Sequence, residues 1–175
     1  MNGTGKTTLL KSIAGLIPFS GDIHLNDISL KKDPVAYRRL VTFAEAEPEY
    51  PTYLTGEELI GFVSKARKYS MEETNKIIDY LGMTSYISQP CGGYSAGMLK
   101  KLSLCMAFSG NPRLILLDEP FAFIDQDTED LLLSLINKRR NLKTQIILTS
   151  HHEVKYDKLL VEAEYLIKDQ SISKM

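Results

Sequence analysis

The chain begins MNGTGKTT, a run in which two glycines are followed by a lysine and two threonines. Its Gly5, Lys6 and Thr7 match the last three places of the pattern G-x-x-x-x-G-K-[ST], whose backbone N–H groups enclose a phosphate. Such a loop lies between a strand and the N-terminus of a helix, and residues 8–16 have the apolar spacing of a helix packed on a sheet. The start of the chain therefore predicts an α/β fold with an anion site at a helix N-terminus.

Each residue type in this loop suits phosphate chemistry. Gly3 and Gly5 tolerate the positive φ that turns N–H groups inward, and Lys6 adds a positive charge. The hydroxyl of Thr7 is a suitable ligand for Mg²⁺. The residues expected to bind the phosphates are Asn2, Gly3, Thr4, Gly5, Lys6, Thr7 and Thr8. The alternative interpretation is a glycine-rich turn in front of an ordinary helix.

The first glycine of the loop pattern would fall just before Met1, together with the strand that normally leads into the loop. Without that strand, neighbouring strands would keep unpaired backbone groups and helices would expose apolar faces. We therefore expect a fragment of a longer domain or a misassigned start codon.

The composition is that of a single domain without a membrane span. The chain has 175 residues and a net charge of -1, which favours neither nucleic acid nor an anionic membrane surface as a partner. No apolar run approaches the roughly 18 residues that a transmembrane helix needs. Cys91 and Cys105 are too few and too far apart for a metal site or a disulfide framework, so we expect buried, reduced thiols.

Strand and helix patterns alternate along the chain, which predicts a largely parallel sheet. An antiparallel hairpin is expected over residues 21–30, with its turn at Asn26 and Asp27. The strands expected in the sheet are residues 41–44, 114–117 and 145–149, with 165–167 and 171–173 closing it. The later helices are expected over residues 56–68, 70–82, 96–109 and 126–140. Thr55 is the expected cap of the first, and Ser70 begins a capping box for the second.

The segment LILLDEP is an apolar strand that ends abruptly in two carboxylates. Parallel strands present functional residues at their carboxyl ends, so Asp118 and Glu119 are expected beside the phosphate loop. Asp118 is the candidate Mg²⁺ ligand, and Glu119 is the candidate base that polarises an attacking water. The alternative is a polar turn after a core strand.

A second candidate anion site lies in CGGYSAGM, residues 91–98. Ser95, Ala96 and Gly97 stand at the predicted start of a helix, where N–H groups and a hydroxyl bind anions. Since the first loop already surrounds one phosphate, this second site is expected to serve a partner subunit. The alternative interpretation makes Ser95 a helix N-cap beside flexible glycines.

These segments resemble the motifs of the ATP-binding cassette family, and the resemblance covers nearly the whole chain. MNGTGKTT is similar to the end of the Walker A loop, YSAGM to the signature, and LILLDEP to Walker B with its catalytic glutamate. AFID, which ends at Asp125, resembles the D-loop, and His151 occupies the place of the switch histidine. The resemblance implies a P-loop ATPase that binds ATP and Mg²⁺. It also implies a head-to-tail dimer, in which Ser95, Ala96, Gly97 and Asp125 face the partner's ATP.

Two of these positions also have simpler interpretations. His151 is followed by His152, and a pair of surface histidines is the alternative to a sensor of the γ-phosphate. Asp125 suits the N-cap of the following helix, a role compatible with the D-loop.

The chain departs from the family pattern where the Q-loop glutamine is expected. The aligned residue is Ala46. Two alternatives stay open: Glu45 or Glu47 supplies an oxygen to Mg²⁺ or to the attacking water, or their negative charge weakens ATP binding. In the signature, Ala96 replaces a glycine and Met98 a glutamine. The adenine-stacking residue of the family would precede Met1.

The resemblance thus implies the ATP-hydrolysing motor of a transporter, with export as the expected direction. We expect a homodimer at the cytoplasmic face of the membrane, held there by separate permease subunits and not bound to nucleic acid. A helical subdomain is expected over about residues 55–98. The permease would contact this subdomain and residues 48–59, with Tyr50, Tyr53 and Leu54 as candidates; the alternative is a loop that packs on itself. The alternatives are a catalytically impaired fragment and an ATPase that does not take part in transport.

Overall fold

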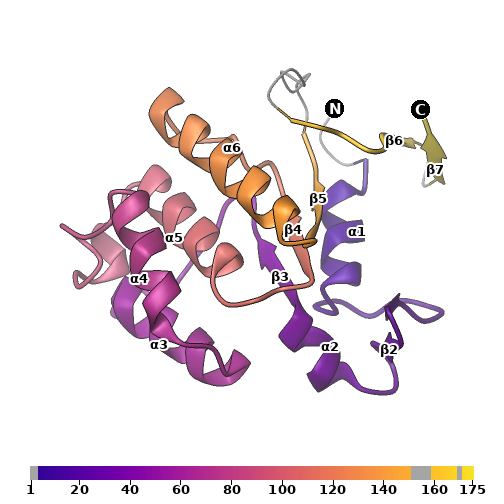
Figure 1. Ribbon diagram of the computed structural model, residues 1–175, viewed down its shortest axis with the longest axis horizontal. Coiled ribbons are helices and arrows are strands. Elements are labelled where there is room, and N and C mark those ends of the chain that lie inside the picture. Colours follow the sequence, from indigo (N-terminus) through magenta and orange to yellow (C-terminus); the bar gives the residue numbers. More distant parts are fainter. Residues whose placement is uncertain (1–3, 151–158, 169–170) are drawn as a thin grey trace.

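The structure is a computed structural model that describes residues 4–150, 159–168 and 171–175 (Figure 1). Its central sheet contains three parallel strands in the order β3 (Val41–Ala44), β4 (Leu114–Leu117) and β5 (Gln145–Leu148). The strands are in register, with Val41 beside Leu114 and Leu114 beside Gln145. All three predicted strands and their parallel arrangement are confirmed, and their carboxyl ends meet at one edge.

Helices cover both faces of this sheet, and they bury β4 along its whole length. Leu114 and Leu116 pack in one cluster with Leu10 of helix α1 (Lys6–Ile13). Ile115 and Leu117 point to the other face, where they belong to a larger cluster with residues of α5 (Ala96–Phe108) and α6 (Gln126–Asn141). The phosphate-loop helix and the signature helix therefore lie on opposite faces of the sheet.

Two helices and a short 3₁₀ turn precede α5 and pack beside it, namely α3 (Gly56–Arg67), α4 (Met71–Tyr80) and η1 (Cys91–Gly93). The cap at Thr55 is confirmed and forms a complete capping box with Glu58. The capping box predicted at Ser70 is wrong, because its hydroxyl accepts from the Glu72 N–H. The Glu73 carboxylate lies 4.0 Å from the Arg139 guanidinium of α6 instead of returning to the cap.

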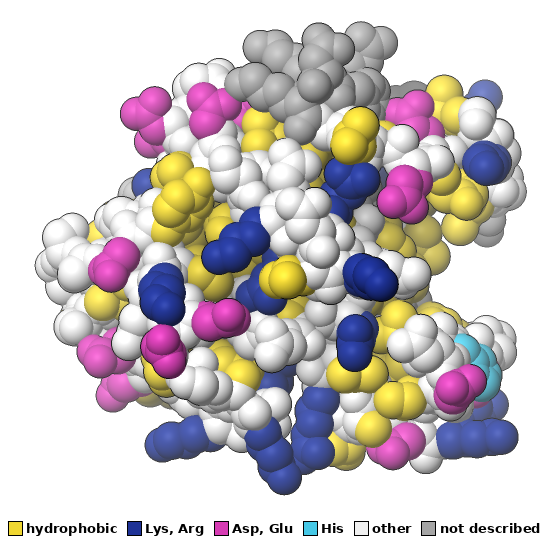
Figure 2. Space-filling view, viewed as in Figure 1, with side chains coloured by type: hydrophobic (Ala, Val, Ile, Leu, Met, Phe, Trp, Pro, Cys, Tyr) yellow, Lys and Arg dark blue, Asp and Glu magenta, His cyan; other side chains and the backbone are white. Residues whose placement is uncertain are grey.

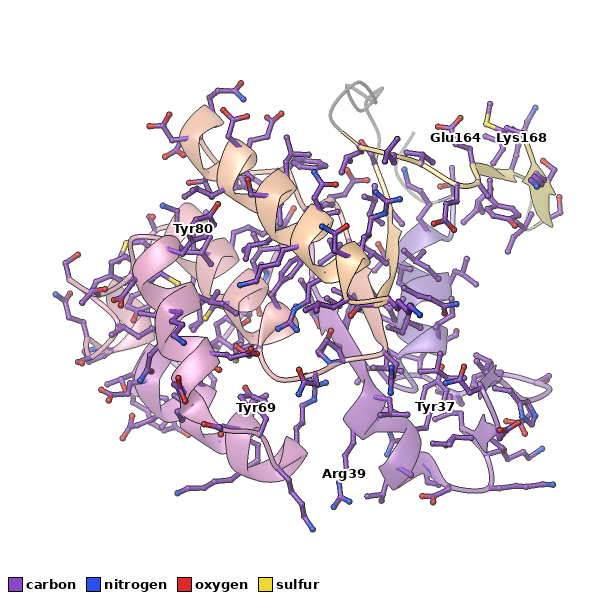
Figure 3. All side chains as sticks on the ribbon, viewed as in Figure 1. Tyr37, Arg39, Tyr69, Tyr80, Glu164 and Lys168 are labelled. Atoms are coloured by element: carbon purple, nitrogen blue, oxygen red, sulfur yellow. The ribbon has the colours of Figure 1, made fainter. Side chains whose placement is uncertain are left out.

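The predicted hairpin is present as β1 (His24–Leu25) and β2 (Ile28–Ser29), with Asn26 at φ 52° in its turn. Helix α2 (Pro34–Leu40) is not among the predicted helices, although Asp33 caps it and proline occupies its first position. Tyr37 of this helix is fully buried and donates to the Ile13 carbonyl at the end of α1 (Figure 3).

Strands β6 (Tyr165–Lys168) and β7 (Ser171–Lys174) pair with each other and form a separate antiparallel sheet. The prediction that they close the central sheet is wrong. Apart from the half-buried Ile167, the residues of both strands are exposed; in Figure 3, Glu164 lies just before β6 and Lys168 at its end.

The described surface mixes acidic and basic side chains (Figure 2). Basic side chains are densest along the edge formed by α2 and the end of α3, which includes Arg39, Arg67 and Lys68. None of the described helices combines the length and apolar character of a membrane span. Both cysteines are buried and free, as predicted, and burial raises the pKa of Cys105 to about 12.

Candidate active site

The carboxyl edge of the central sheet brings the phosphate loop and the acidic strand end together. The hydroxyl of Thr7, in the first turn of α1, donates to Oδ2 of Asp118 at 2.7 Å. Asp118 directly follows β4 and is only 1% exposed. The predicted proximity of these two residues, which are 111 positions apart in the chain, is therefore confirmed.

The N-terminus of α1 offers backbone donors to an anion. Gly5 precedes the helix at φ 93°, a left-handed conformation that residues with a side chain rarely adopt. No described side chain caps this end, and no acidic residue lies in its first turn. Thr4, Gly5, Lys6, Thr7 and Thr8 thus form the described part of the loop, whereas Asn2 and Gly3 lie outside the described residues.

Lys6 connects the phosphate loop to the ends of two strands. Its Nζ lies 3.5 Å from Oε1 of Glu119 and donates to the Ser150 carbonyl at 2.9 Å. Both partners of the ion pair are largely buried, which limits solvent screening of their attraction. The candidate phosphate-binding cation and the candidate base therefore lie side by side.

The backbone of Glu119 is strained, with φ at 44°. Its N–H donates to Oγ1 of Thr149 at 3.1 Å, and the same hydroxyl donates to Oδ1 of Asp118 at 2.6 Å. Thr149, which is 8% exposed, thus holds both acidic residues. Thr149 was predicted only as the last residue of a strand, without a role in the site. The signal in the sequence was a hydroxyl residue at the end of one strand, next to the strand that ends in Asp118 and Glu119.

The oxygen atoms at this edge fit Mg²⁺. Thr7 contributes a hydroxyl and Asp118 a carboxylate, both hard oxygen donors, and they are already within 2.7 Å of each other. Mg²⁺ is usually held by one or two carboxylates and completes its shell with water and phosphate oxygens. The arrangement therefore suits a magnesium ion that enters with a phosphorylated substrate.

The second candidate anion site is exposed. Ser95 and Ala96 lie on the surface at the start of α5, and the Ser95 hydroxyl accepts from the Met98 N–H at 3.2 Å. The N-cap interpretation of Ser95 is confirmed, and it leaves the helix end open to solvent. A Cβ on Gly97 would lie 3.1 Å from the carbonyl oxygen of Phe123, so the 122–125 loop approaches this helix end closely.

Asp125 is the N-cap of α6, as the simpler interpretation predicted. Its Oδ1 accepts from the Thr128 N–H at 2.8 Å, and the hydrogen bonds with Thr128 lower the pKa of its carboxyl. His151 lies outside the described residues.

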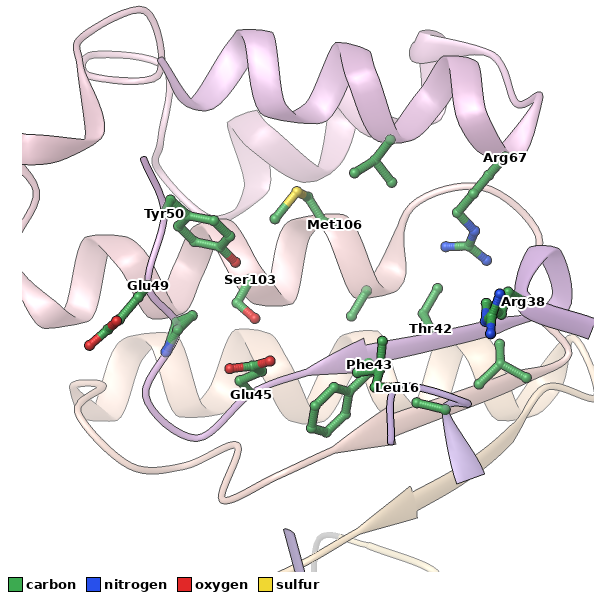
Figure 4. A pocket seen from close by; sticks show the side chains of 15 residues that line it. Leu16, Arg38, Thr42, Phe43, Glu45, Glu49, Tyr50, Arg67, Ser103 and Met106 are labelled. Carbon is green, nitrogen blue, oxygen red and sulfur yellow. The ribbon is translucent and has the colours of Figure 1, made fainter. Parts of the chain in front are cut away.

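A cavity of about 350 Å³ opens between β3, α3 and α5 (Figure 4). Glu45, Glu49 and Tyr50 lie toward one end of it, and Arg38 and Arg67 toward the other. Burial raises the pKa of Tyr50 to about 12, opposed by a hydrogen bond with Ser103. The cavity is thus acidic at one end and basic at the other.

Comparison with known proteins identifies the family. The family model of the ABC transporter matches residues 1–122. The cytochrome c biogenesis ATP-binding export protein CcmA of Legionella pneumophila (strain Lens) is 31% identical, over 94% of this chain and 82% of that protein. The chelated iron transport system membrane protein YfeB of Yersinia pestis is also 31% identical, over 87% of this chain and 54% of its own length.

Solved structures agree with this assignment. A structure described as the ATP binding subunit of an ABC transporter covers the whole chain at a TM-score of 0.89 and 25% identity, with 76% of its own length matched. The chain therefore belongs to the ABC transporter family of ATP-binding subunits and has their α/β P-loop NTPase fold.

Proposed function

We propose that this chain hydrolyses ATP and that two copies of it drive a membrane transporter, with export as the direction. The observation that carries the proposal is the group formed by Lys6, Thr7, Asp118, Glu119 and Thr149 at one edge of the sheet. It combines a phosphate-binding cation, a magnesium ligand set and a positioned carboxylate, which are the parts that phosphoryl transfer to water requires.

Each residue has a distinct task in this reaction. The N–H groups of α1 and Lys6 would bind the β- and γ-phosphates, and Thr7 and Asp118 would hold Mg²⁺, which offsets the negative charge of the phosphates. Lys6 then exchanges its Glu119 partner for phosphate oxygens. The freed Glu119 carboxylate accepts a proton from the attacking water as the new O–P bond forms and the bond to the leaving ADP oxygen breaks.

The second copy would complete each site. Ser95 and Ala96 are exposed and Gly97 is half-buried, and their helix lies on the opposite face of the sheet from α1. A single chain is therefore poorly arranged to use both anion sites on one nucleotide. A head-to-tail pair would place residues 95–97 and Asp125 of each copy against the nucleotide held by the other.

The permease would dock at the cavity beside Tyr50. Tyr53 is exposed and Leu54 half-buried in the adjoining loop, and the charged ends of the cavity suit a short helix with complementary ends. A permease contact there would keep the chain at the cytoplasmic face of the membrane. Export rests on the similarity to CcmA, whose name describes an export protein.

Calorimetric titration with MgATP and a phosphate-release assay test the proposal on the unaltered chain, two site variants and one control variant. Glu119→Gln should bind MgATP but hydrolyse it about 100-fold more slowly, because the amide cannot accept the proton. Lys6→Ala should lose MgATP binding. Glu164→Gln, which alters an exposed carboxylate just before β6, is the matched control and should behave like the unaltered chain. Unaltered hydrolysis in Glu119→Gln would refute the proposed mechanism, and a folded chain that binds no MgATP would favour the impaired fragment.

A further inference from the structure

Lys100 is a lysine of α5 that is 0% exposed. Its Nζ donates to three carbonyl oxygens, those of Glu45 at 2.8 Å, Ala46 at 3.1 Å and Asp118 at 3.0 Å. An ammonium group has three N–H donors, so all of them are used. Among the described residues, no carboxylate forms an ion pair with this ammonium.

Burying a charged ammonium among carbonyl groups costs free energy, which the hydrogen bonds must offset. Burial disfavours the charged lysine and, although the charges of Asp118, Glu119 and Glu47 oppose the shift, its pKa falls to about 8. Three carbonyl dipoles that converge on one point also repel one another. An apolar side chain of equal length would avoid the buried charge but leave three carbonyls without a donor. The ammonium therefore stabilises a convergence of chain segments that would otherwise separate.

The three carbonyls belong to the candidate active site. Glu45 and Ala46 directly follow β3, at the position where the family pattern places its Q-loop glutamine. The Asp118 carbonyl belongs to the peptide unit that links Asp118 to Glu119. The N–H of that same peptide donates to Thr149, so the unit is held at its oxygen by Lys100 and at its nitrogen by Thr149.

We propose that Lys100 is a positioning residue, which orients the Asp118–Glu119 peptide and ties the candidate base to the 45–46 segment and to the helix that begins at Ser95. The orientation of this peptide determines the left-handed φ of Glu119, which directs its side chain toward Lys6. Since α5 also carries the signature residues, a shift of that helix would be transmitted to the carboxylate. The role rests on the proposed function of Glu119.

Lys100→Met removes all three donors and keeps an unbranched side chain that is one atom shorter, whereas Lys100→Gln retains two N–H donors. We expect Lys100→Met to lower kcat roughly tenfold or more while the Kd for MgATP stays within about twofold, because orientation and not binding is lost. Lys100→Gln should recover part of kcat. Lys76→Met, an exposed lysine paired with Glu72 on α4, is the control and should change neither value.

Amide hydrogen exchange at Glu119, followed by NMR, gives a readout that does not depend on turnover. The exchange rate should rise about tenfold in Lys100→Met, fall back in Lys100→Gln and stay unchanged in Lys76→Met. Unchanged exchange at Glu119, or a kcat loss explained entirely by the unfolded fraction at the assay temperature, would overturn the proposal. A chain without Glu119-dependent hydrolysis would instead refute the proposed function, and the exchange data would still decide the role of Lys100. If Lys100→Met does not fold, Lys100→Gln carries the same comparison.

Discussion

At the scale of single residues, the geometry of the acidic residues depends on hydrogen bonds from side chains elsewhere in the fold. Asp118 and Glu119 are adjacent in the chain, yet their geometry is set by Thr149 and Lys100, which come from a neighbouring strand end and a helix on the far face. A left-handed φ at a non-glycine residue costs about 1–3 kcal/mol, so Glu119 needs such external contacts to stay in place.

Thr149→Val should lower both stability and turnover. Valine has nearly the same shape but leaves Oδ1 of Asp118 and the Glu119 N–H without their partner, at a cost of about 1–3 kcal/mol in the free energy of unfolding. Urea denaturation and kcat measure the two effects.

Thr144→Val is the matched control for this change. Thr144 is equally buried, at 8% exposed, and its hydroxyl donates to the Pro112 carbonyl at the other end of β5. Its loss should reduce stability without altering kcat of the folded protein. Equal kcat values for the two variants would contradict the role given to Thr149.

At the scale of elements, helix ends carry much of the local order. Thr55, Ser70, Ser95 and Asp125 each cap a helix, and all four were visible as polar residues ahead of apolar periodic segments. The capping partners were less predictable, since Glu73 turns to Arg139 on another helix.

Thr55→Ala should reduce the free energy of unfolding by about 1 kcal/mol, because α3 loses a reciprocal capping box. Ser70→Ala should cost less, since that hydroxyl accepts one longer hydrogen bond, of 3.2 Å, from Glu72. Urea denaturation of both variants gives the comparison. A larger loss for Ser70→Ala would show that the capping box of α3 contributes little.

At the scale of the whole molecule, the arrangement of α1 and α5 on opposite faces determines how nucleotide sites can be built. The exposed start of α5 is available to a second chain, and the loop of α1 is available to a nucleotide. In the proposed head-to-tail dimer, the phosphate loop of one chain and the start of α5 of the other would together form each nucleotide site.

Glu119→Gln with MgATP should form a dimer of about twice the 19.7 kDa chain mass, measured by light scattering after gel filtration. Ala96→Glu should abolish that dimer, since a carboxylate at the exposed start of α5 repels the partner's phosphates. MgATP binding by its own phosphate loop should persist, which the calorimetric Kd tests. A dimer that survives Ala96→Glu would place the interface elsewhere.

Local patterns in the chain determined a great deal by themselves. The three parallel strands, the hairpin, the caps at Thr55 and Asp125, and the meeting of Thr7 with Asp118 follow from periodicity, turn residues and motif spacing, all of which act over short stretches. Helix α2 belongs to the same class, because its capping Asp33 and first-turn proline are local signals that were overlooked.

Other features were decided only by the tertiary structure. Thr149 reaches two carboxylate residues across a pair of strands, Lys100 joins three segments through the core, and β6 and β7 pair apart from the central sheet. The residues that flank a hydroxyl at a strand end or a lysine on a helix do not indicate which distant group it will hydrogen-bond. Its role depends on distances between segments that are far apart in the chain, and packing of the complete α/β core sets those distances.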